Sequence, residues 1–68
     1  MTREQIELMA ALADERKIAK LDRALRRRFS NPYSEIPAEE LRENYAYNVI
    51  AAAFDRCLDE WEIIEMMQ

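Results

Sequence analysis

The chain has 68 residues and a net charge of −4, and half of its residues are apolar. A chain of this length forms one domain at most, spanning 1–68, and the composition is that of a folding protein. It has no histidine and no glycine, which excludes the commonest general base and the glycine-rich phosphate loops. We therefore expect a protein that is not an enzyme and that holds no metal or cofactor.

Glycine and proline, the residues that most often interrupt regular structure, are nearly absent, since only Pro32 and Pro37 occur. The sequence therefore predicts an all-α fold. The single cysteine, Cys57, excludes an intrachain disulfide. Its apolar neighbours Ile50 and Phe54 favour a buried structural thiol over a nucleophile.

A first helix is expected over about 2–29. Thr2 followed by Gln5 is typical of a capping box at a helix start. One apolar stripe, with spacings of three and four residues, runs through Ile18, Leu21, Leu25 and Phe29. A second apolar side is formed by Ile6, Met9 and Ala13.

A loop is expected over 30–36, followed by a second helix over about 37–67. Asn31 tolerates the left-handed conformation that ends a helix, and Pro37 suits a helix start. The second helix is also apolar on two sides. The residues expected in the core or in a dimer contact are Ile6, Met9, Ala13, Tyr45, Val49, Ile50, Phe54 and Trp61.

One short loop between two helices of similar length predicts an antiparallel two-helix hairpin. A contact within the hairpin covers one side of each helix and leaves the other apolar side exposed. We therefore expect a homodimer in which two hairpins form a four-helix bundle.

Charge is segregated along the chain: 1–29 carries a net +3 and 30–68 a net −7. A basic strip on the first helix consists of Arg16, Lys20, Arg23 and Arg27. An acidic strip on the second helix consists of Asp55, Asp59 and Glu62. Each strip is either a solvated face or a binding surface. Tyr33, in the loop, is the candidate for an exposed recognition contact.

These features favour a regulator that inhibits a larger cytosolic protein, such as a transcription factor, by masking its DNA-binding surface with the acidic strip. The chain resembles in kind the short, acidic, helical regulators that phages and plasmids encode. The expected hairpin dimer also resembles the repressor-of-primer family, which implies an alternative, RNA or DNA binding by the basic strip. A structural assembly subunit is the second alternative.

The first residues show no basic segment followed by an apolar run, and no stretch of about 18 apolar residues occurs anywhere. A lone thiol is typical of a reducing compartment. We therefore expect a cytoplasmic protein without a membrane contact.

Overall fold

The computed structural model describes residues 2–56 and 58–68, which form α-helices and no strand. The predicted all-α class is therefore confirmed for the described residues, while Cys57 and the expectation for its thiol lie outside them. The helices are α1 (Arg3–Leu12), α2 (Glu15–Arg28), α3 (Ala38–Glu43), α4 (Tyr45–Asp55) and α5 (Glu60–Met66).

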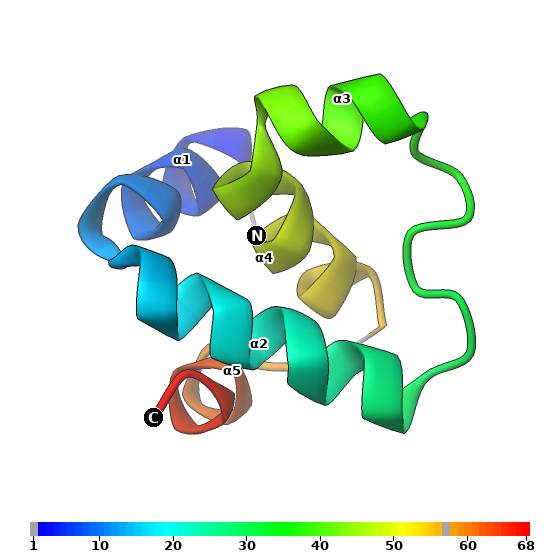
Figure 1. The fold of residues 1–68 in the computed structure, drawn as a ribbon. Coiled ribbons are helices and arrows are strands. Elements are labelled where there is room, and N and C mark those ends of the chain that lie inside the picture. The colour runs from blue at the N-terminus through cyan, green and yellow to red at the C-terminus, as the bar shows by residue number, and fades with distance from the viewer. Residues whose placement is uncertain (1, 57) are drawn as a thin grey trace.

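Helix α4 is the centre of the fold. It packs against α1, α2, α3 and α5, and Figure 1 shows it in the middle of the molecule with α2 below it in the view. Val49, Ile50 and Ala53 of α4 are fully buried because neighbouring helices cover several of its sides. The apolar run of the sequence thus becomes a central core helix.

The predicted hairpin is not confirmed. A helix of 28 residues would be about 42 Å long, but the molecule measures 25 × 23 × 22 Å. Each expected long helix is instead divided into shorter helices that change direction. The apolar sides that called for a second copy therefore meet within one chain.

The first long helix is interrupted at Ala13 and Asp14. The Asp14 carboxylate accepts a hydrogen bond from the Lys17 backbone N–H at 2.9 Å and so caps the start of α2. The break turns Ile6 of α1 and Ile18 of α2 toward the same core. The predicted capping box of Thr2 and Gln5 is confirmed at the start of α1.

The second long helix is interrupted twice. At Asn44 the backbone leaves helical geometry between α3 and α4, and the buried Asn48 side chain donates to the Glu40 carbonyl across this bend. At Asp59 a new capping box with Glu62 starts α5. Leu58, just before this cap, is buried, so the bend folds α5 back onto the core.

The irregular segment between α2 and α3 contains the predicted loop 30–36. Within it, Asn31 has a φ of 50°, the left-handed conformation that its sequence position predicted. Pro37 immediately precedes α3 and caps it with its backbone alone.

The core expectations hold for most residues. Ile6, Val49 and Ile50 are buried. Met9, Ala13 and Phe54 are half-buried and pack against the core. Trp61, expected in the core or in a dimer contact, is not in the core, because the bend before α5 turns its side chain outward and leaves it 76% exposed. Tyr45 is 36% exposed, and its hydroxyl reaches Asp22.

Candidate functional site

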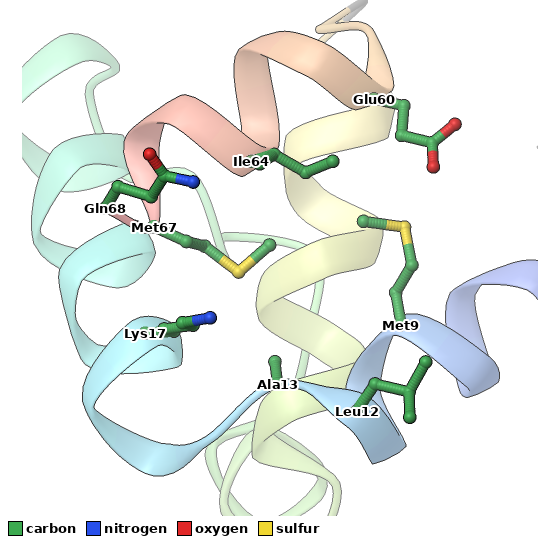
Figure 2. Close-up of a pocket in the computed structure, with 8 residues that line it drawn as sticks. All are labelled: Met9, Leu12, Ala13, Lys17, Glu60, Ile64, Met67 and Gln68. Carbon is green, nitrogen blue, oxygen red and sulfur yellow. The ribbon is translucent and has the colours of Figure 1, made fainter.

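An open groove lies between α1 and α5. Both helices contact α4 rather than each other in the described part of the chain, and the space between them is about 260 Å³. Figure 2 shows the side chains that line it, from α1, α2 and α5. We call this feature the α1–α5 groove, and its lining is Met9, Leu12, Ala13, Lys17, Glu60, Ile64, Met67 and Gln68.

Large apolar side chains extend this groove onto the surface. Leu12 is 78% exposed, and Leu8, one helical turn earlier on the same side of α1, is 61% exposed. On α5, Trp61 lies one turn before the groove residue Ile64. We call Leu8, Leu12, Trp61 and Ile64 the apolar patch. Leu8, Leu12 and Trp61 are therefore exposed large apolar side chains on the two helices that border the groove.

A second hollow adjoins the groove on the side of α2. We call it the basic hollow, and its lining is Asp14, Arg16, Lys17, Lys20, Met67 and Gln68. Lys17, Met67 and Gln68 line both spaces, so the apolar groove opens directly toward three cationic side chains. The Lys20 ammonium also donates to the Gln68 backbone oxygen at 2.5 Å, which ties the segment after α5 to α2.

The predicted basic strip is preserved on a single helix. Arg16, Lys20, Arg23 and Arg27 all lie in α2 and are exposed. The buried side of α2, formed by Ile18, Leu21 and Leu25, faces the opposite way. Because the strip runs from Arg16 to Arg27, eleven helical rises apart, it is about 16 Å long.

The predicted acidic strip is divided by the bend between α4 and α5. Asp55 is the last residue of α4, whereas the Asp59 carboxylate caps α5 by accepting from the Glu62 backbone N–H at 2.8 Å. Glu62 in turn lies 3.9 Å from Arg28, in an exposed and therefore weak ion pair. The three carboxylates do not share one helix face, and two of them have structural roles.

Tyr33 is buried at 6% exposure, so its expected role as an exposed recognition residue is wrong. Its hydroxyl donates to the Asp22 carboxylate at 2.7 Å, and the Arg26 guanidinium lies over its ring at 4.9 Å. The Tyr45 hydroxyl also donates to the Asp22 carboxylate, and the Arg26 guanidinium donates to the same carboxylate at 2.8 Å. Three polar side chains therefore donate to one carboxylate, and the two tyrosines among them fasten the loop and α4 to α2.

Hydrogen bonding shifts the acidity of this cluster. Partial burial by itself would raise the pKa of Asp22, but the bonds from Tyr33, Tyr45 and Arg26 together lower that pKa below its ordinary value. Burial and the bond to Asp22 raise the pKa of Tyr45 to about 12, and they raise that of Tyr33 further. The cluster is therefore most stable as a carboxylate with two neutral tyrosines.

Sequence reasoning missed the apolar patch because it expected two long helices, with Trp61 in the core or in a dimer contact. The signal for the patch was the Asp14 and Asp59 caps, which indicate where the helices change direction. Among the described residues no helix is long and apolar enough to cross a membrane, and no group of side chains there is arranged to hold a metal ion.

The fold and the groove together define a small all-α protein with large apolar side chains exposed on the helices that border an open groove. The sequence matches no protein-family model, and comparisons with curated proteins and with solved structures give no match either.

Proposed function

We propose that this protein is a non-catalytic protein-binding module that occupies a surface of a larger protein, and that its contact is the apolar patch. The observation that carries the proposal is the exposure of Leu8, Leu12 and Trp61 on the two helices that border the α1–α5 groove. Burying a side chain of this size is worth about 1.5–3 kcal/mol. Tryptophan is moreover the residue type most enriched among residues that dominate interface energies.

The size of the groove favours protein side chains as its ligand. At about 260 Å³ it is smaller than the sites of about 300–1,000 Å³ that enclose small molecules, and it is open to solvent. It accommodates one or two apolar side chains of a partner while the patch covers the surrounding surface. An inhibitor that masks a functional surface, such as the DNA-binding face of a transcription factor, needs no more than such a contact.

The partner-binding site proposed here is the apolar patch and not the acidic strip. Asp59 and Glu62 cap α5, so their replacement would disturb the helix as well as any contact. A homodimer through the apolar patch is the competing use of the same surface.

The test is affinity capture from nuclease-treated lysate, comparing the unmodified protein with the double variant Leu12→Ser, Trp61→Ser. We expect a specific protein to be recovered by the unmodified chain and lost with the variant. Because both side chains are exposed, the free energy of unfolding of the variant should lie within about 0.5 kcal/mol of that of the original protein. The matched control is Glu35→Ser, Arg42→Ser, which changes two exposed residues outside the patch.

Recovery of the same protein by both double variants would contradict the proposed site. Sedimentation velocity over a range of concentrations provides the second readout. A dimer that is abolished by Leu12→Ser, Trp61→Ser would assign the patch to self-association instead.

A second candidate function is nucleic-acid binding by the basic strip. The observation that favours it is that α2 holds seven basic and two acidic residues, a net charge of +5 on one helix. Arg16, Arg23 and Arg27 lie in no ion pair among the described residues, and arginine is well suited to contact phosphates.

A further inference from the structure

We infer that the segment held by the α1–α5 groove is an acidic apolar one, with a carboxylate close to the apolar side chain that enters the groove. This inference rests on the proposed function and specifies the chemistry of its partner. The basis is the direct connection between the groove and the basic hollow, which share Lys17 as a common wall residue.

Three cations face the place where a docked segment would leave the groove. Arg16, Lys17 and Lys20 line the basic hollow, and Asp14 is the one acidic side chain among its lining residues. The Asp14 carboxylate already accepts the Lys17 backbone N–H as the cap of α2. The hollow therefore presents a net positive charge to any chain that lies across both spaces.

The position of Lys17 links the two spaces. Figure 2 shows its side chain extending from α2 toward the groove, across from Leu12 and Ile64. A carboxylate about one helical turn from a docked leucine or phenylalanine would lie within reach of this ammonium. A lysine or arginine at the same position of the partner would be repelled.

Glu60 gives the groove a direction. It lines the groove near the start of α5, whereas Lys17 and Gln68 line it near the end of that helix. One end of the groove is thus acidic and the other basic. A partner segment should enter with its carboxylate toward α2, which makes one orientation more favourable than the reverse.

The experiment is a selection of random 16-residue peptides displayed on phage against the full chain at about 0.15 M salt. We expect the enriched peptides to combine large apolar residues with Asp or Glu, in excess over Lys and Arg. The strongest peptide is then synthesised, and its affinity is measured for three charge and patch variants by fluorescence anisotropy.

The decisive variant is Arg16→Glu, Lys17→Glu, and its matched control is Arg23→Glu, Arg27→Glu on the same side of α2. Both double variants change the net charge equally. Only the first lies at the basic hollow, and the control residues begin about 10 Å further along the helix. Since charges beyond about 8 Å are largely screened at this salt concentration, we expect about a tenfold loss of affinity in the first variant and less than about threefold in the control.

Glutamates in the first turn of α2 are favourable for the helix dipole, so the decisive variant should remain folded. Equal losses in the two variants, or enriched peptides without excess acidic residues, would overturn the inference. If the Leu12→Ser, Trp61→Ser variant still bound the peptide, the proposed function itself would be overturned. If that variant lost the peptide while the two charge variants lost affinity equally, only the preference for acidic segments would be overturned.

Discussion

At the scale of single residues, Asp22 explains why Tyr33 does not have the exposed position that the sequence predicted. It is the lone acidic residue between Arg16 and Arg28, and the sequence places it at the edge of the apolar stripe. In the structure its carboxylate accepts bonds from Tyr33, Tyr45 and Arg26. Tyr33, the expected recognition residue, is thereby part of the fold.

We predict that Asp22→Asn lowers the free energy of unfolding at pH 7 by about 2 kcal/mol, since hydrogen bonds to a charged group contribute about 1.5–3 kcal/mol. The folded pKa of Asp22 lies below its unfolded value, so this stability is present above about pH 4 and is lost as the pH falls further. Urea unfolding between pH 2 and 7 measures it. Asp55→Asn, an exposed control, should retain the acid dependence.

The same cluster also produces an alkaline limit to stability. The pKa of Tyr45 is raised to about 12, so the contribution of its neutral form is complete below about pH 10 and is lost as the pH rises through the folded value. Tyr33 contributes in the same direction. The Asp22→Asn variant should therefore lose less of its free energy of unfolding at alkaline pH, because it lacks the carboxylate that disfavours tyrosinate.

At the scale of elements, the main difference from expectation is where helices end. The expected helix over 2–29 has continuous helical periodicity, and nothing in its hydrophobic pattern requires a break. The break comes from Asp14, whose carboxylate competes for the Lys17 backbone N–H. The pattern Asp59-x-x-Glu62 is likewise a capping box, which the acidic-strip interpretation overlooked.

We predict that Asp14→Ala destabilises the protein by about 1 kcal/mol, the usual contribution of an N-cap. Asp14→Asn is the matched control, because its amide oxygen still accepts the Lys17 N–H and stability should be nearly unchanged. Chemical denaturation of the three proteins gives the comparison. If the alanine variant were more stable, and more helical by circular dichroism, α1 and α2 would favour one continuous helix, and the Asp14 cap would not be stabilising.

At the scale of the whole molecule, charge is concentrated in one helix. α2 carries a net +5 while the chain carries −4, so the remaining residues together carry −9. The exposed face of α2 is therefore attractive to anions, whereas the surrounding helices repel an extended polyanion. This arrangement favours a short acidic segment over a long nucleic acid, but it leaves the second candidate function open to direct test.

If the basic strip binds nucleic acid, we predict that the affinity falls steeply as the salt concentration rises. Four phosphate contacts give a slope of about −3.6 in log K against log salt, which corresponds to about a 100-fold loss of affinity for duplex DNA between 50 and 200 mM. Arg23→Glu, Arg27→Glu should then abolish binding. Affinity that is independent of salt, or unchanged in this variant, would eliminate the candidate.

The sequence by itself determined the all-α class, the capping box at Thr2, the left-handed Asn31, the loop after α2 and the basic strip. These features depend on interactions between residues a few positions apart, which a sequence pattern contains directly. The single acidic strip and a core position for Trp61 both required a long, straight second helix, which the structure does not contain. Tyr33 was expected to be exposed because it lies in the loop, but its bond to Asp22 holds it against the core.

Only the tertiary structure decided how the helices turn at Asp14, Asn44 and Asp59, and therefore which apolar side chains meet. The physical reason is that a two-sided apolar helix can bury its second side either against another chain or by bending onto its own core. A local cap contributes only about 1 kcal/mol, which is small beside the burial of several apolar side chains. The packing of α1, α2 and α5 around α4 selects the bend, and it leaves Leu8, Leu12 and Trp61 at the surface.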